Sequence, residues 1–150
     1  MVTITETPFD PWQTISQYQE QMQCDGEFGA CATFVGTMRD MNEGDEVNGM
    51  LLEHYPGMTE KHLESIVANA EEKWGLLDTL VVHRVGELFP NDPIVLVAVW
   101  SAHRKDSFEA CRFIMEDLKS KAPFWKKESL SEAEQQAGKN RWVENNTSGY

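Results

Sequence analysis

Two strongly apolar runs in the middle of the chain constrain its fold more than any other feature. Residues 79–88, TLVVHRVGEL, and residues 93–103, PIVLVAVWSAH, are rich in the β-branched side chains that strands favour. Pro90, Asn91 and Asp92 lie between the two runs and are typical of a turn. The sequence therefore predicts two strong strands joined by a short turn.

Shorter runs predict further strands. Residues 28–38, FGACATFVGTM, combine β-forming with small side chains and indicate a buried strand, and residues 49–55 indicate another. Residues 39–48 between them are polar, which favours a long loop. Two short strands are expected near the ends of the chain, at residues 2–5 and 141–144.

Two segments in the first half of the chain predict helices. Residues 11–22 indicate a polar helix that Asp10 and Pro11 start. From residue 59 to residue 74 apolar side chains recur at helical spacing, and Gly75 follows as a stop signal.

A third predicted helix follows the second apolar strand. Asp106 is its expected N-cap, with Glu109 three positions later as in a capping box. Pro123 must end it, because proline cannot continue a helix. Its apolar stripe is expected to consist of Phe108, Cys111, Met115 and Leu118. The order of elements predicts an α+β fold, a largely antiparallel sheet with packed helices, in a single domain over residues 1–150.

The composition excludes several classes of function. Thirteen basic residues against 25 acidic ones give a net charge of −12, which argues against general nucleic-acid binding. No apolar run approaches the ~20 residues that a membrane helix needs, and no signal peptide is visible, so a soluble, cytoplasmic protein is expected. The three cysteines form no Cys-x-x-Cys pair, which is poor evidence for a zinc site. Cys111 is expected to be a reduced core residue.

The scarce basic residues gather in one stretch of the chain. Seven of the 13 are Arg104, Lys105, Arg112, Lys119, Lys121, Lys126 and Lys127. His103 and Arg104 lie where the strand gives way to the third helix, and Lys119 lies where that helix closes. Lys126 follows after a proline-fixed extended segment. We therefore expect both ends of this helix to present cations to one cleft, while Arg39 is an isolated cation on a loop.

Ordinary structural roles account for many of these residues taken singly. Lys121 and Lys127 are expected to be solvated, and Phe124 and Trp125 are expected to anchor the lysine segment in the core. His83 lies within a strand-like run, where a histidine is more often a packing residue than a catalyst.

Clustering favours a functional role for the cations. Two lysines brought together depress each other's pKa, because a like charge disfavours the charged form. A lysine tuned in this way can act as a nucleophile or a general acid/base near neutral pH. Arginine and histidine beside it would bind an anionic substrate. The residues alone therefore predict an anion site with a reactive lysine.

Six segments, taken in order, resemble a known family. They are FVGTMRDMNEGDEV (34–47), LEHYPGM (52–58), VHRVGEL (82–88), SAHR (101–104), FEACRFIMEDLKSKAPFWKKE (108–128) and RWVE (141–144). Together they resemble the catalytic, large subunit of molybdopterin synthase, the MoaE family, with Met38 where valine is commoner. Residues 1–27, 129–140 and 145–150 match little, so no function is carried over to them.

The resemblance implies a sulfur-transfer enzyme. The family converts cyclic pyranopterin monophosphate (precursor Z) into molybdopterin, in molybdenum cofactor biosynthesis. The sulfur arrives as a thiocarboxylate on the C-terminal Gly-Gly tail of a small ubiquitin-like subunit. The resemblance also implies a homodimer of large subunits within a heterotetramer and an α+β fold with an α/β hammerhead element. It implies no metal and no organic cofactor for this step.

The resemblance also assigns site residues. Lys119 and Lys126 are the implied catalytic residues. The implied substrate-binding positions are Thr37, Met38, Arg39, His103, Arg104, Lys119, Lys126, Lys127 and Glu128. We infer that Lys119 stabilises charge on the thiocarboxylate carbonyl, whereas Lys126 shuttles protons or holds the pterin intermediate. Arg39, His103 and Arg104 would hold phosphate and pterin oxygens.

Two alternatives from other classes remain open at this point. One is a non-catalytic phosphate- or nucleotide-binding module that uses the same cations. The other is an interaction protein whose Phe124-Trp125 patch docks a partner. A binding module would form no dithiolene product with a thiocarboxylated partner, and an interaction protein would tolerate Lys119→Ala.

Overall fold

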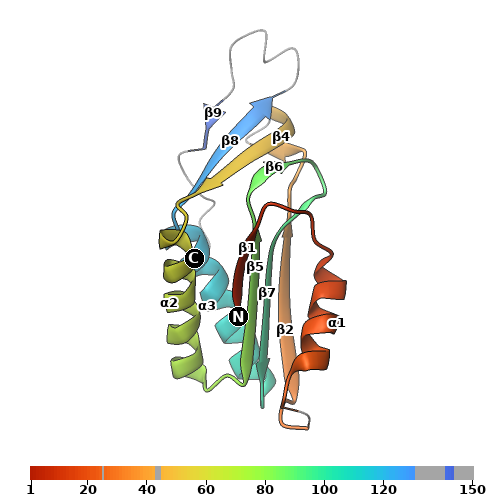
Figure 1. The fold of residues 1–150 in the computed structure, drawn as a ribbon, viewed down its shortest axis with the longest axis vertical. Coiled ribbons are helices and arrows are strands. Elements are labelled where there is room, and N and C mark those ends of the chain that lie inside the picture. The colour runs from red at the N-terminus through yellow and green to blue at the C-terminus, as the bar shows by residue number, and fades with distance from the viewer. Residues whose placement is uncertain (25, 43–44, 131–140, 144–150) are drawn as a thin grey trace.

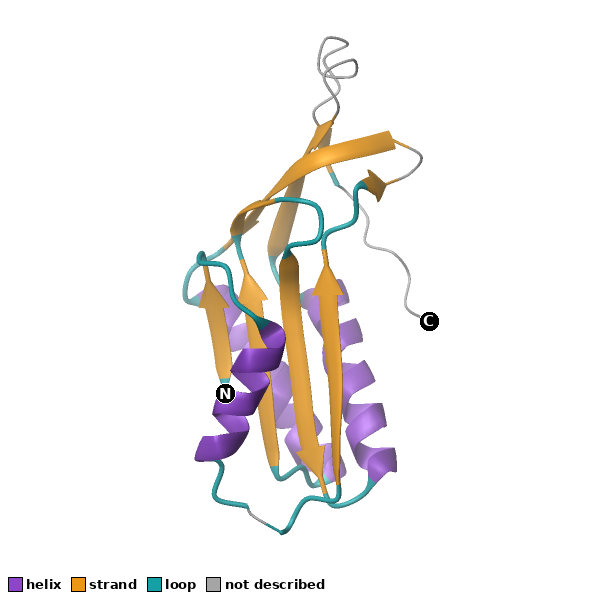
Figure 2. Ribbon diagram, turned by 90° about the vertical axis from the view of Figure 1, so that its right-hand side faces the viewer, coloured by secondary structure: helices purple, strands orange, loops and turns teal. Residues whose placement is uncertain are grey.

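A four-stranded sheet with helices on both faces forms the larger part of the molecule, and a five-stranded sheet lies beyond one end of it (Figure 1, Figure 2). The computed structural model describes residues 1–24, 26–42, 45–130 and 141–143. In chain order the elements are β1 (Val2–Thr5), α1 (Pro11–Gln21), β2 (Ala30–Thr37), β3 (Met41–Asn42), β4 (Asp45–His54), α2 (Met58–Trp74), β5 (Asp78–Arg84), β6 (Gly86–Leu88), β7 (Pro93–Ser101), α3 (Arg104–Lys121), β8 (Phe124–Leu130) and β9 (Arg141–Trp142).

The two apolar runs supply the middle strands of the first sheet, whose order is β1-β5-β7-β2. β5 and β7 pair antiparallel, with Val81 opposite Val97. These two valines lie in the core under α2 and α3, whereas Leu80 and Leu96 lie in the core under α1. The predicted strand pair is therefore confirmed. Helices on both faces explain why its apolar residues run on instead of alternating with polar ones.

Residues 79–88 form two strands rather than the single one predicted. β5 ends at Arg84, and β6 begins at Gly86, whose φ of 86° lies in the left-handed region that favours glycine. This turn sends the chain from the first sheet into the second, where Leu88 pairs with Met50 of β4. The sequence pattern did not reveal the break, because β5 is almost wholly buried and Leu88 of β6 is buried as well.

Residues 39–48 contain strands where a long loop was expected. β3 and the first residues of β4 pair antiparallel there, and residues 43–44 lie outside the described part of the chain. A polar composition does not prevent this pairing, because the ladder joins backbone groups. Beyond it, β4 continues as the central strand of the second sheet, between β6 and β8.

β2 lies at an edge of the first sheet and is not the buried strand that its composition predicts. Ala32 is its one buried residue, and Phe34 is 40% exposed. β2 pairs with β7 along one side only, and no strand of the described residues pairs with its other side. β1, at the opposite edge, pairs in parallel with β5 and confirms the short strand expected at residues 2–5.

The sequence signals for the first two helices are confirmed. Asp10 caps α1, because its Oδ1 accepts a hydrogen bond of 2.9 Å from the backbone N–H of Trp12, and Pro11 is the first helical residue. α2 ends at Trp74, and Gly75 follows it in the left-handed conformation.

α3 begins earlier than predicted. His103 is its N-cap, so Asp106 lies in the first turn and does not cap the helix. Phe108 is 67% exposed and does not belong to the apolar stripe. The buried residues of α3 are Ser107, Ala110, Cys111, Ile114, Met115 and Leu118. The predicted core position of Cys111 is confirmed, and the helix ends at Lys121, just before Pro123 as expected. None of the described helices is long and apolar enough to cross a membrane.

A partly buried ion pair holds the turn between β6 and β7. Arg84 Nη1 lies 3.0 Å from Asp92 Oδ2, and the arginine side chain is almost fully buried. The same turn binds the chain that leaves β2: the backbone N–H of Met38 donates to the Asp92 carbonyl, and the N–H of Asn91 donates to the Met38 carbonyl, both at 2.9 Å. The ion pair therefore fixes the backbone immediately before Arg39.

Asp92→Ala is expected to lower the free energy of unfolding by about 1–3 kcal/mol, because it leaves the buried Arg84 guanidinium without its carboxylate. Glu87→Ala is the matched control, since Glu87 holds Arg84 only through its backbone carbonyl and should change stability by no more than about 0.5 kcal/mol. Denaturant unfolding of both variants measures the difference. Equal stability of the two variants would contradict the role of the ion pair.

Candidate active site

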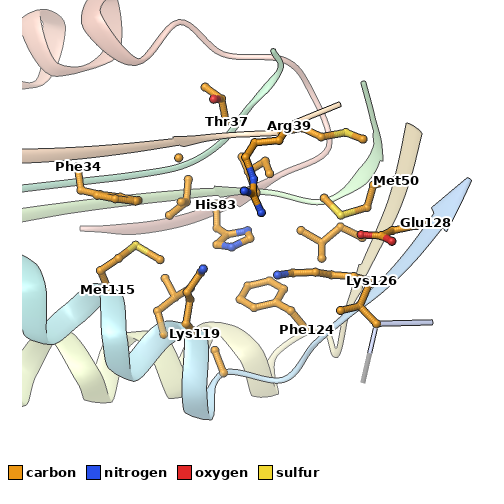
Figure 3. Close-up of a pocket in the computed structure, with 18 of the residues that line it drawn as sticks. Phe34, Thr37, Arg39, Met50, His83, Met115, Lys119, Phe124, Lys126 and Glu128 are labelled. Carbon is orange, nitrogen blue, oxygen red and sulfur yellow. The ribbon is translucent and has the colours of Figure 1, made fainter. Parts of the chain in front are cut away.

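A cavity of about 430 Å³ lies where the two sheets meet the end of α3 (Figure 3). Its walls are largely apolar, with a small group of polar and charged side chains among them. The main apolar residues are Phe34, Met50, Leu52, Ile94 and Met115. The polar and charged residues are Thr37, Arg39, His83, Lys119, Lys126 and Glu128. This combination is typical of a small-molecule site.

The connection between α3 and β8 brings two lysines together. Lys119 lies in the last turn of α3, and Lys126 is the third residue of β8. Between them Ala122 is the C-cap of the helix, and the carbonyl of Pro123 accepts a hydrogen bond of 3.2 Å from Thr59 Oγ1 of α2. Figure 3 shows both lysine side chains reaching into the same space. The lysines thus enter one cavity from a helix end and a strand start.

The alternation along β8 decides which side chains reach the cavity. Phe124, Lys126 and Glu128 line it, as expected for residues two positions apart in a strand. Trp125 is 47% exposed, so its expected role as a core anchor is wrong. Lys127 is exposed, as predicted, and its Nζ lies 5.8 Å from the centre of the Trp142 ring. Lys127 does not line the cavity.

The exit of β2 supplies the opposite wall. Thr37, Met38 and Arg39 all line the cavity, and Figure 3 shows the guanidinium of Arg39 directed toward His83. Arg39 is therefore not the isolated cation that its place in the sequence indicated. Gly36 lets Val95 of the neighbouring strand pack closely against this wall, because a Cβ there would lie 2.8 Å from a methyl group of Val95.

Burial and the lysine pair together tune the charges. The pKa of Lys126 is lowered, first because burial disfavours its charged form and second because Lys119 is a like charge nearby. Glu128, which is buried, acts in the opposite direction on the same lysine. The pKa of His83 is lowered to about 4, chiefly by burial. His83 is therefore neutral near pH 7, and the positive charge comes from the arginine and the lysines.

The other two expected cations lie far from this cavity. His103 is the N-cap of α3 and Arg104 is its first residue. Lys119 follows Arg104 by 15 residues (119 − 104), which in an α-helix is about 22 Å. The expectation that both ends of the helix present cations to one cleft is therefore wrong within a single chain. The helix that links the two clusters in sequence separates them in space.

Many lining residues were missing from the expected site, and three of them lie close to the lysine pair (Figure 3). Phe34 and Met115 form apolar walls, and His83 is the polar residue among them. Sequence reasoning assigned Met115 to the core and His83 to packing. Only the meeting of the two sheets, which no local pattern encodes, places them at one cavity.

The described residues contain no group of three His, Cys, Asp or Glu side chains that could hold a metal ion. The chemical groups that the cavity does offer are amines, a guanidinium, a neutral imidazole and a carboxylate. Such a set can bind anions, stabilise developing negative charge and exchange protons.

Together, the fold and the cavity define an α+β protein with a cationic small-molecule site built on a coupled lysine pair. Comparison with known proteins gives the family. The model of the MoaE protein family matches residues 4–121, so the chain belongs to this family.

Relatives and solved structures agree with this assignment. The chain is 58% identical over 118 residues to a molybdopterin synthase catalytic subunit of Ralstonia nicotianae, a match that covers 79% of this chain but 64% of that protein. It is 47% identical over 143 residues to that of Pseudomonas aeruginosa, covering 95% and 89%. The structure of molybdopterin synthase from Staphylococcus aureus superposes with a TM-score of 0.80 at 33% identity, over 95% of this chain and 96% of that one.

These comparisons confirm the family resemblance and the α+β fold class. They also correct one expectation, because the family match includes residues 4–27, which were expected to match little. The P. aeruginosa alignment extends over most of the chain.

Lys119→Met is expected to raise the pKa of Lys126, because it removes the like charge but leaves a side chain of similar length in the cavity wall. Lys121→Met is the control, since Lys121 pairs with Asp117 at 2.7 Å outside the cavity. The rate at which an amine reagent modifies Lys126, followed against pH by peptide mass spectrometry, measures the pKa. An unchanged profile in the Lys119 variant would show that the two amines are not coupled.

Proposed function

We propose that this chain is the catalytic subunit of a molybdopterin synthase. It would transfer sulfur from the C-terminal thiocarboxylate of a small ubiquitin-like subunit to cyclic pyranopterin monophosphate. The observation that carries the proposal is the convergence of Arg39, Lys119 and Lys126 on one cavity, in a chain whose net charge is −12. Its relatives are named as molybdopterin synthase catalytic subunits.

The cavity suits a small substrate that combines a ring system with a phosphate. Its volume of about 430 Å³ is within the usual range for small-molecule sites. Phe34, Met50 and Met115 offer apolar surface to a ring system. Arg39 is exposed at one wall, where its planar guanidinium can bind a phosphate with two parallel hydrogen bonds.

The two lysines have different roles in the proposed reaction at the acyl group of the thiocarboxylate. Once the sulfur is bound to the substrate, water adds to the acyl carbon, and the C–S bond then breaks to leave a carboxylate on the tail. Negative charge develops on the acyl oxygen in the tetrahedral intermediate, and a fixed cation stabilises it. Lys119, at the helix end, takes this role in our proposal. Lys126 moves protons, because its lowered pKa brings it closer to neutral pH than an ordinary lysine. The charge of buried Glu128 favours the ammonium form of this lysine.

The proposed partner enters through its tail. A chain that ends in two glycines has no side chains at its tip, so it can pass through a narrow opening to reach Lys119. The pull of Arg39 and the lysines on the charged tail is local and should weaken with salt. We further propose that the chain forms a homodimer within a heterotetramer. His103 and Arg104 can then contribute to substrate binding only at the cavity of a second copy.

The two alternative functions receive less support. Phe124 is half-buried and stacks on His83, while Trp125 points to the other side of β8, so the two side chains do not form one docking patch. A phosphate-binding module has no need for a half-buried lysine with a lowered pKa. Reconstitution with the thiocarboxylated small subunit and precursor distinguishes an enzyme, which forms molybdopterin, from a binding module, which does not.

Lys119→Ala is expected to reduce molybdopterin formation by about 10²–10⁴-fold while leaving the fold intact, because it removes a positioned cation. Lys121→Ala is the matched control: it lies two residues away and is exposed, and its activity should stay near that of the wild type. Single-turnover assays with the reconstituted complex measure both. Activity of the Lys119 variant within a few-fold of the wild type would exclude its catalytic role.

Arg39→Ala is expected to weaken precursor binding by about ten- to a hundredfold, since a hydrogen bond to a charged group contributes about 1.5–3 kcal/mol. Small-subunit binding should change less. Arg112→Ala serves as a control because Arg112 is exposed on α3 and does not line the cavity. Calorimetric titration with precursor and with the small subunit compares the variants. Equal precursor affinity in both would contradict the role of Arg39.

A further inference from the structure

A histidine that none of the proposed steps uses lines the cavity together with the lysine pair. His83 lies near the end of β5, where it is only 5% exposed. Figure 3 shows its imidazole between Arg39 on one side and Lys119 and Lys126 on the other. His83 is thus the one imidazole in the described cavity wall, and it is neutral whereas these three side chains around it are cationic.

The hydrogen bonding of the ring fixes its tautomer. Nδ1 lies 2.9 Å from the backbone carbonyl oxygen of Arg84, and a carbonyl oxygen can only accept a hydrogen bond. Nδ1 therefore carries the proton. Because the ring is neutral near pH 7, Nε2 holds a lone pair and is an acceptor. Among the described residues, none forms a hydrogen bond with Nε2.

Packing prevents the ring from turning. His83 stacks on Phe124 with 4.0 Å between the ring centres and 15° between the planes. A flip of the ring would exchange the Nδ1–H for a C–H against the Arg84 carbonyl and break the hydrogen bond. The stack and the hydrogen bond together hold Nε2 in a single position.

The groups around Nε2 indicate that a ligand would bind it with a hydrogen-bond donor. Arg39, Lys119 and Lys126 are donors that suit the anionic parts of a substrate. Glu128 is engaged with Lys126 electrostatically. An acceptor in the cavity wall that no described side chain pairs with favours a ligand that brings an N–H or O–H group to it. A reduced pterin carries several N–H groups on its rings.

We propose that Nε2 of His83 accepts a hydrogen bond from an N–H group of the pterin substrate and so sets the orientation of its ring system, an inference that rests on the proposed function. The cations bind the charged groups of the substrate. Many metabolites carry such groups, so the cations alone do not select for the pterin. His83 selects for the ring, because a substrate without a donor at this position covers Nε2 without replacing its hydrogen bond to solvent. His83 is thus a specificity-determining residue rather than a packing residue.

Two substitutions separate recognition from packing. His83→Phe keeps an aromatic ring against Phe124 but removes the acceptor, whereas His83→Gln removes the ring but can present an amide oxygen near the place of Nε2. In the reconstituted complex, His83→Phe should raise the KM for precursor about ten- to a hundredfold, with a smaller change in kcat. His83→Gln should retain more of the affinity. A purely structural role predicts the reverse order, because only the Gln variant loses the stack.

Wild-type protein supplies the measurement that does not depend on folding of a variant. In the complex labelled with ¹⁵N-histidine, the Nε2 signal of His83 should move toward the protonated range when precursor saturates the site, while the Nδ1 signal stays in place. An active wild type with an unmoved Nε2 signal, or a His83→Phe variant with unchanged KM and thermal stability, would overturn the inference alone. A wild-type complex that forms no molybdopterin would overturn the proposed function and this inference with it.

Discussion

The stack of His83 on Phe124 is the contact on which the rest of the site depends. His83 belongs to β5 of the first sheet, and Phe124 is the first residue of β8 in the second. Phe124 also packs against the core under α2 and α3 and against the core of the second sheet. The stack therefore joins the two sheets at the point where the chain leaves α3. Because Lys119 precedes this point and Lys126 follows it, one aromatic anchor fixes the spacing of both amines.

The same junction explains how an acidic chain keeps cations close together. Two like charges repel, and burial disfavours the charged form of Lys126, so an unsupported lysine pair would move into solvent. The packing of Phe124 and the pairing of β8 with β4 hold the backbone in place, and buried Glu128 favours the lysine charge. The remaining surface is acidic overall, so attraction for anions is concentrated at the cavity.

Local signals in the sequence predicted the helices and most strands, but not where the two sheets meet. Asp10, Gly75 and Pro123 act on neighbouring residues, and the helix ends that they indicate are confirmed. Gly86 was overlooked because Val85 and Leu88 on either side of it are apolar core residues, although it directs the chain into the other sheet. The cations next to Arg104 were grouped with Lys119 because they are near in sequence. Arg104 and Lys119 are 15 residues apart along α3, so the rise of the helix separates them. This separation could have been calculated from the predicted helix alone.

Position along a strand, rather than residue type, decides what the histidine of β5 does. Val81 and His83 face the same side of the first sheet, since side chains two apart share a face. Val81 lies beneath α2 and α3 in the core, whereas His83 and its cross-strand partner Val95 line the cavity. The difference arises because α3 ends at Lys121, ahead of Pro123. A helix continued by one more turn in the same direction would extend over the end of the sheet where His83 lies. The proline that ends α3 therefore also leaves the imidazole facing the cavity, so one break between α3 and β8 forms both the cationic part and the neutral part of the site.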